Sequence, residues 1–398
     1  MVSHRVLHMR ISLVMASISF VILAGCQPKA IKPLDPNSNA SILEYHKPVV
    51  DQGHKDYALR ELERGTLFFE LGDYCDADVR LANACRVMDE ITGNKTAETT
   101  AVLWAESSKP FKGAPHERAT AYFYRGLCRY RMNDYSGALA AFRHSLACDG
   151  ETRSKNQKDL EDFCISHVMA AMCYLQLNEP ENAEAALRLA GLYLPEASKS
   201  YLTVDRLNRN FVLILGVGFG PFLKPSSWDV SIKSVECLPN EEAGVEVCVD
   251  DKSVGKAIEL TDLYTQAKSQ SWGDMDTVRV AKAVGKRAVS YIPVVGGLLA
   301  HAVRSEADLR CWLGLPRKFY LVSADLPQGQ HTVSLRFTSP KEADLENYTQ
   351  VWFDVPVSGP SNLYFLKCIK YYQNCHGLEP HNITANAIPT TSGKGDTR

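Results

Sequence analysis

The sequence lacks the short motifs that carry the best-known enzyme chemistries. It has no GxSxG nucleophile motif, no HExxH zinc motif, no phosphate-binding loop and no CxxC pairs with zinc-finger spacing. Its 11 histidines are scattered along the chain. Its formal net charge is -2, and its lysines and arginines form no basic block. The absence of a basic block argues against a nucleic-acid-binding protein. They also leave no candidate catalytic residue, no metal site and no cofactor site, so the sequence predicts a protein that is not an enzyme.

Long apolar runs are also absent. A transmembrane helix needs about 20 apolar residues, and the run from Ile11 to Ile22 is shorter than that. The uncharged stretch from Ala288 to Val303 is shorter too, and Pro293 interrupts it. Neither segment is predicted to cross a membrane as a helix.

The N-terminus has the organisation of a secretory signal. Arg5 and Arg10 precede the apolar run, and Leu23-Ala24-Gly25-Cys26 follows it. This arrangement resembles the signal of bacterial lipoproteins. The resemblance implies that residues 1–25 are removed and that Cys26 is acylated, with an ordinary cleaved signal as the alternative. Gln27 after the cysteine implies, by the same resemblance, the outer membrane facing the periplasm, although the inner membrane is not excluded.

The signal predicts that the rest of the chain lies in an oxidising compartment, where disulfides persist. Eleven of the 12 cysteines remain beyond Cys26, so at least one is unpaired. Candidate disulfides join Cys237 to Cys248 across a short polar loop, and Cys368 to Cys375.

The segment 26–55 is polar and proline-containing, which predicts an extended tether.

Residues 56–200 contain three copies of one helix-turn-helix pattern. Each copy has a small residue seven positions before a turn, and small or apolar residues follow the turn at fixed spacing. The pattern resembles the tetratricopeptide repeat, in which small residues let two antiparallel helices pack closely; the alternative is a plain helical bundle. The turns begin at Gly72, Asn133 and Asn178, the preceding small residues are Gly65, Gly126 and Ala171, and the following residues are Ala77, Leu81, Ala84, Ala138, Phe142, Ser145, Ala183, Leu187 and Ala190.

The remainder of the chain is predicted to be mainly β. The continuous apolar run 211–215 indicates a buried strand, and the glycines after it indicate a structural turn. Short alternating runs separated by turn signals then predict a sandwich-like domain over 210–375. An insertion at about 260–309 is expected to form either a helical hairpin packed on the sheet or an interfacial segment. Residues 376–398 are expected to form a disordered tail.

The chain as a whole is therefore predicted to be an α+β multidomain protein. This order of elements is similar to that of a largely uncharacterised family of bacterial lipoproteins. Segments that look like landmarks of that family are Glu63-Arg64-Gly65, residues 113–118 and residues 307–312. The resemblance implies no particular activity.

The candidate binding surface is the concave side of the array, which the first helix of each repeat lines on the tetratricopeptide template. An exposed apolar groove usually marks a partner-binding site. The alternative is that the chain's own β-half or insertion fills this groove. The predicted concave residues are Leu62, Thr66, Phe69, Phe123, Leu127, Tyr130, Arg131, Val168, Met172 and Gln176.

The predicted function is that of a membrane-anchored scaffold for protein-protein interaction. Its helical repeats would bind a protein or peptide of the bacterial cell envelope. A different class of function, carbohydrate binding or catalysis by the β-half, is the alternative.

Overall fold

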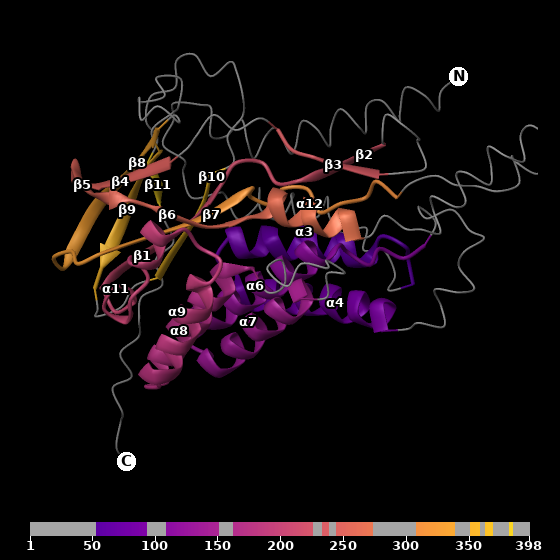
Figure 1. Ribbon diagram of the computed structural model, residues 1–398, viewed down its shortest axis with the longest axis horizontal. Coiled ribbons are helices and arrows are strands. Elements are labelled where there is room, and N and C mark those ends of the chain that lie inside the picture. Colours follow the sequence, from indigo (N-terminus) through magenta and orange to yellow (C-terminus); the bar gives the residue numbers. More distant parts are fainter. Residues whose placement is uncertain are drawn as a thin grey trace, which may run out of the picture.

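The computed structural model describes residues 53–93, 109–150, 162–225, 233–238, 244–273, 308–338, 351–358, 363–368 and 382–384. The helices of the N-terminal half occupy one side of the molecule and most strands the other (Figure 1). The lipoprotein signal with Cys26 lies outside the described residues, as do most of the tether, Cys375 and the second part of the predicted insertion. An α+β architecture, with a helical array followed by a β-region, is confirmed.

Three helical hairpins form the N-terminal part of the described chain. Consecutive hairpins pack against each other, so that α4 contacts α6 and α7 contacts α8. Two short helices, α10 (Glu196–Lys199) and α11 (Val204–Leu207), then lead to the first strand. The hairpins are α3 (Tyr57–Glu70) with α4 (Tyr74–Gly93), α6 (Pro115–Arg131) with α7 (Tyr135–Gly150), and α8 (Cys164–Gln176) with α9 (Pro180–Gly191).

The turns inside the hairpins lie where the repeat pattern predicts them. Gly72, Asn133 and Asn178 have φ values of 81°, 62° and 61°, in the left-handed region that ends a helix and that glycine and asparagine tolerate. Asp73 and Asp134 follow the first two of these residues, and each carboxylate accepts a hydrogen bond from a backbone N–H three residues later. These aspartates therefore cap the second helix of their hairpins.

Close helix packing explains the small residues of the pattern. A Cβ added at Gly65 would lie 2.6 Å from Leu81 Cγ, and one added at Gly126 would lie 2.4 Å from Phe142 Cε1. Both distances are too short for non-bonded carbon atoms, so an alanine at either position would push the hairpin apart. The helical-repeat prediction is confirmed at these positions.

The strands form two larger sheets and one hairpin. The first sheet, sheet A, has the order β10-β1-β7-β6, and the second, sheet C, has the order β11-β9-β8-β4-β5. In sheet A, β1 pairs parallel with β10 and antiparallel with β7. The strands are β1 (Phe211–Val217), β2 (Phe222–Pro225), β3 (Lys233–Glu236), β4 (Gly244–Val249), β5 (Lys252–Lys256), β6 (Ile258–Asp262), β7 (Lys318–Ala324), β8 (Gly329–Thr338), β9 (Val351–Val357), β10 (Leu363–Cys368) and β11 (Asn382–Thr384); α12 (Leu263–Gly273) follows β6.

Sheet A is the middle of three layers. All seven residues of β1 are buried, as its continuous apolar run predicts. Phe211, Leu213 and Leu215 face a core shared with sheet C. Val212 and Ile214 point the other way, into a core shared with the helices. Because side chains alternate along a strand, β1 supplies both cores at once.

The glycine-rich segment after β1 is a structural turn, as expected. Gly218 has a φ of 78°. The Gly220 N–H donates to the Leu315 carbonyl at 2.7 Å, and a Cβ at Gly220 would lie 2.7 Å from that same oxygen. Glycine is required here because another backbone segment passes directly against the turn.

The predicted bridge between Cys237 and Cys248 is wrong. Both cysteines are unbridged: Cys237 directly follows β3 of the β2–β3 hairpin, whereas Cys248 belongs to β4 of sheet C. The polar loop between them does not connect a hairpin, because β3 pairs with β2 while β4 pairs with β5 and β8. The nine cysteines whose side chains the structure describes, from Cys75 to Cys311, are all unbridged.

The predicted disordered tail needs a correction at three residues, while the rest of 376–398 lies outside the described residues. Asn382–Thr384 forms β11 and pairs in parallel with residues 352–354 of β9. Isoleucine and threonine favour extended backbone, and β9 offers the unpaired edge beside which a short strand can add.

Within the described segments, no helix combines the length and the hydropathy that a membrane crossing requires.

Candidate functional site

The residues predicted to bind a partner lie on α3, α6 and α8, and nearly all of them are buried. Among the predicted set, Arg131 is half-buried and Gln176 is exposed. Tyr130 packs edge-on against Tyr135 with ring centroids 5.1 Å apart, so it supports its own hairpin. The buried members are Leu62, Thr66, Phe69, Phe123, Leu127, Tyr130, Val168 and Met172.

Sheet A of the same chain covers this face. The ring of Phe123 lies 5.2 Å from that of Phe319 on β7, and the ring of Phe69 lies 5.4 Å from that of Phe365 on β10. Edge-to-face pairs at such distances add stabilisation beyond burial alone. The prediction of an open groove is therefore wrong, and the alternative, that the β-half fills it, is what the structure shows. The physical reason is that sheet A has a second apolar face, which must also be buried.

Polar contacts fix the register between the helices and the sheet. The guanidinium of Arg131 donates to the Leu363 carbonyl, and the Lys367 ammonium pairs with the Glu70 carboxylate. On the third hairpin, the Ile165 N–H donates to Thr261 Oγ1 at 3.2 Å. Arg131, one of the predicted partner-binding residues, thus binds a backbone carbonyl of its own chain.

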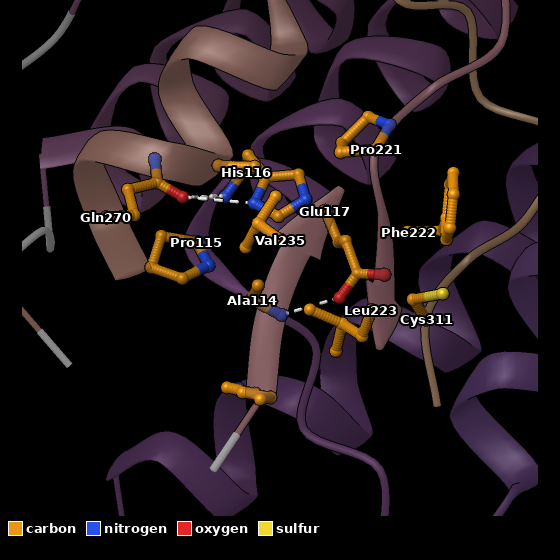
Figure 2. A pocket seen from close by; sticks show the side chains of 12 residues that line it. Ala114, Pro115, His116, Glu117, Pro221, Phe222, Leu223, Val235, Gln270 and Cys311 are labelled. Atoms are coloured by element: carbon orange, nitrogen blue, oxygen red, sulfur yellow. Dashed lines mark hydrogen bonds between the residues drawn. The ribbon is translucent and has the colours of Figure 1, made fainter. Parts of the chain in front are cut away.

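A second feature of interest is the place where two of the predicted landmark segments meet. Glu117, in the first turn of α6, accepts a hydrogen bond from the Ala114 N–H at 2.7 Å and another from the Trp312 N–H at 2.5 Å. Residues 113–118 and 307–312 are far apart in the sequence, and this carboxylate joins them. Figure 2 shows Glu117 pointing toward Leu223 and Cys311, away from Gln270.

Electrostatics at Glu117 follow from these contacts. Burial raises the pKa of the Glu117 carboxyl, and the two backbone N–H donors oppose that rise. The position at the start of α6 also favours negative charge, because the N-terminus of a helix carries partial positive charge. We therefore assign Glu117 to holding the 308–312 segment on α6.

His116 binds the opposite side of the same junction. Its backbone N–H donates to Gln270 Oε1 at 2.9 Å, and its ring Nδ1 lies 3.1 Å from the same oxygen. Gln270, on α12, donates in turn to Asp149 Oδ1 at 3.2 Å. Burial lowers the pKa of His116 to about 4, so its imidazole is neutral at pH 7. A neutral Nδ1–H donates to the Gln270 oxygen, which ties α12 to α6.

Arg310 fastens the same segment to the start of the array. Its guanidinium pairs with Asp308 and with Asp56, each at 2.7 Å. It also donates to the carbonyls of Lys55 at 3.1 Å and Lys109 at 2.7 Å. A planar guanidinium with several fixed donors can satisfy this many acceptors, whereas a lysine ammonium cannot reproduce the geometry.

The cavity at this junction is too small for a metabolite. Its volume is about 40 Å³, whereas small-molecule sites usually measure about 300–1,000 Å³. Cys311 lines it, and burial raises the pKa of this thiol to about 11, so the reactive thiolate is not formed at neutral pH. The junction therefore holds the helices, the 308–312 segment and the β2–β3 hairpin together. Its backbone contacts could not be inferred from the sequence, although the landmark segments marked two of its parts.

Comparison with known proteins adds little. No family model matches the chain, and no curated protein matches it. Among solved structures, the chain is similar to the crystal structure of MamA, at 12% identity, over 39% of this chain and 75% of that one, with a TM-score of 0.26. A similarity at that TM-score carries no argument, so the helical-repeat assignment rests on the turns and close helix contacts described above.

Proposed function

We propose that the protein is a membrane-tethered scaffold of the bacterial cell envelope, which binds another envelope protein through the outer surface of its helical array. The anchor is Cys26, acylated after removal of residues 1–25, as the Leu-Ala-Gly-Cys signal implies. The tether then separates the folded region from the membrane.

The outer surface is proposed because the inner one is occupied. Sheet A covers α3, α6 and α8, and the second helices of the hairpins, α4, α7 and α9, keep more exposed residues. Figure 1 shows α4 and α7 on the far side of α3 and α6 from the sheet. A rigid array whose inner face is already packed presents these outer helices in a fixed geometry. Rigidity lowers the entropic cost of binding.

One observation carries the choice of surface. Leu189 and Leu192 lie three positions apart near the end of α9, with 48% and 70% of their surface exposed. Residues three apart on a helix are neighbours, so the two leucines form one patch. Terminal repeats of helical arrays normally present a polar outer face to water. An apolar pair at the end of this array therefore supports a protein contact at α9.

The test compares affinity purification of the full chain from crosslinked envelopes with that of two variants. Leu189→Asp combined with Leu192→Asp should lower recovery of the partner at least about thirtyfold, since the loss of a hot-spot residue costs about 2 kcal/mol or more. Val79→Asp on α4 is the control, because Val79 is similarly exposed but lies on another helix. Unchanged recovery in the double variant, or equal loss in the control, rejects α9 as the docking surface.

Anchoring is tested separately. Intact-mass analysis of the membrane fraction should find a lipid-modified N-terminal Cys26, and density-gradient fractionation should place the protein with outer membranes. A Cys26→Ser variant should leave the membrane fraction. An unmodified cysteine, or a mature N-terminus elsewhere, contradicts the proposed tether.

A further inference from the structure

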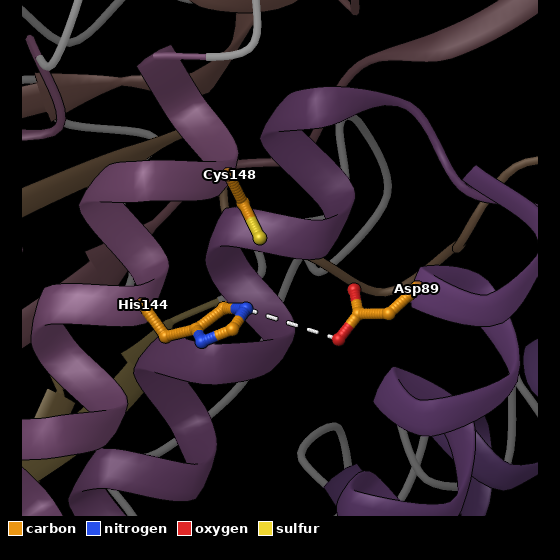
Figure 3. A group of neighbouring side chains, drawn as sticks. All are labelled: Asp89, His144 and Cys148. Carbon is orange, nitrogen blue, oxygen red and sulfur yellow. Dashed lines mark ion pairs between the residues drawn. The ribbon is translucent and has the colours of Figure 1, made fainter. Parts of the chain in front are cut away.

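A cluster of metal-binding side chains lies on the outer side of the array, away from the junction. Asp89 comes from α4, and His144 and Cys148 come from α7, where they are four residues apart and therefore on one face of the helix. Figure 3 shows the three side chains converging on one space between the two helices. They offer one oxygen, one nitrogen and one sulfur ligand.

The spacing of these atoms is close to that of a tetrahedral zinc site. All three ligand atoms lie within 4.8 Å of one another, and His144 Nε2 is 3.8 Å from Asp89 Oδ2. In a tetrahedral site with bonds of about 2.0–2.3 Å, ligand atoms lie ~3.3–3.8 Å apart. The separations here therefore exceed those of a bound site by at most ~1.5 Å.

Tyr122 on α6 holds two of the ligands in place. Its ring stacks on the His144 imidazole, with centroids 4.0 Å apart and planes 25° apart. Its hydroxyl donates to Asp89 Oδ2 at 2.5 Å. Outer residues that orient the ligands are the usual support of a metal site, and here one tyrosine orients both the imidazole and the carboxylate.

Access and charge also suit a cation. The side chains of His144 and Asp89 are 51% and 35% exposed, so an ion can reach them from solvent, while the Cys148 sulfur is buried behind them. The nearby cation Arg125, whose guanidinium lies 5.5 Å from the Tyr122 ring centroid, pairs with Asp78 at 3.1 Å. Helix α7 ends two residues after Cys148, and the C-terminal end of a helix carries partial negative charge.

We propose that Asp89, His144 and Cys148 form a binding site for Zn²⁺. A mixed oxygen, nitrogen and sulfur set suits this borderline-soft ion. On binding, the Cys148 thiol loses its proton to solvent and the thiolate coordinates the ion; no electron is transferred. The fourth position is left to a water molecule. The ion would crosslink α4 to α7 and thereby stabilise the contact between the first two hairpins.

The test uses Co²⁺ as a coloured probe and Zn²⁺ as its competitor, added to the full chain. One equivalent of Co²⁺ should bind, with a thiolate-to-cobalt charge-transfer band, and Zn²⁺ should displace it. Cys148→Ser should abolish that band. His144→Ala should weaken Zn²⁺ at least about tenfold, and Tyr122→Phe, which keeps the ring but removes the hydroxyl, about tenfold.

Matched controls separate this site from surface binding. His54 is 48% exposed and lies 4.0 Å from Asp56, which makes a similar histidine–aspartate pair without a cysteine. Cys75 is an exposed thiol elsewhere on α4. His54→Ala and Cys75→Ser should bind Zn²⁺ like the wild type.

Either of two results overturns the proposal. One is no saturable binding of Co²⁺ or Zn²⁺ to the folded chain. The other is unchanged affinity in His144→Ala, a variant that should fold because that side chain is half exposed; a melting curve without metal verifies its folding.

Discussion

Truncation of Phe123 tests how the two halves of the protein are joined. Phe123 on α6 is fully buried and packs against Phe319 on β7, which is also fully buried. Changing a buried phenylalanine to alanine usually costs 3–5 kcal/mol, because the transfer energy is lost and a cavity remains. If the concave face were open, the same change would cost less, because Phe123 would have only its contacts within the helical array to lose, with Phe142 and Phe163.

The assay is urea unfolding of the full chain, followed by tryptophan fluorescence and far-ultraviolet circular dichroism. One apolar core contains residues from both the helices and sheet A, so both probes should report a single transition. Phe123→Ala and Phe319→Ala should each lower the free energy of unfolding by ~3–5 kcal/mol. The double variant should show a coupling energy of ~0.5–1.5 kcal/mol, as expected for an aromatic pair in contact.

Phe337 provides the control for that cycle. It belongs to the other core, between the two sheets, on the far side of sheet A from Phe123. Phe123→Ala and Phe337→Ala should therefore be additive within ~0.5 kcal/mol. The account is refuted if Phe123→Ala costs less than ~1 kcal/mol, or if Phe123 and Phe319 show no coupling beyond this control.

Three further predictions concern the junction and the cysteines. Since burial lowers the pKa of His116 from 6.5 to about 4, the folded state should lose about 3 kcal/mol as the pH falls through that range; urea unfolding of His116→Gln at several pH values should lack this loss. Arg310→Ala should lower the melting temperature, and Arg310→Lys should not restore it, because lysine cannot reach the same acceptors. Peptide mapping after alkylation of the native protein should find Cys75 modified and the buried Cys85 protected.

The repeats could be predicted from the sequence because each signal is local. A small residue seven positions before a turn, as at Gly126, and a left-handed residue in the turn, as at Asn133, are set by packing within one hairpin. What covers the first helices could not be predicted in the same way. Phe123 and Phe319 meet across nearly 200 residues, and periodicity shows only that a face is apolar, not what it contacts.

One signal in the sequence could have shown that sheet A covers the first helices of the hairpins. The unbroken apolar run of β1 requires partners on both faces of sheet A, and a single opposing sheet covers only one of them. The predicted Cys237–Cys248 bridge is wrong because the short loop between the cysteines joins strands that do not pair with each other. The sequence does not reveal the proposed metal ligands. His144 and Cys148 have the four-residue spacing of a helix face, but the third ligand, Asp89, belongs to another hairpin, and no sequence pattern links it to them.

Zero-length carbodiimide crosslinking tests the central claim, that the chain's own sheet A fills the concave face of its helical array. Lys367 on β10 pairs with Glu70 on α3 across this interface. Lys318 pairs with Glu259 inside sheet A at 2.7 Å, and the two lysine side chains are equally exposed, at 14%. Mass spectrometry should find both crosslinks in the monomeric full chain. A Lys318–Glu259 crosslink without the Lys367–Glu70 crosslink would contradict the account.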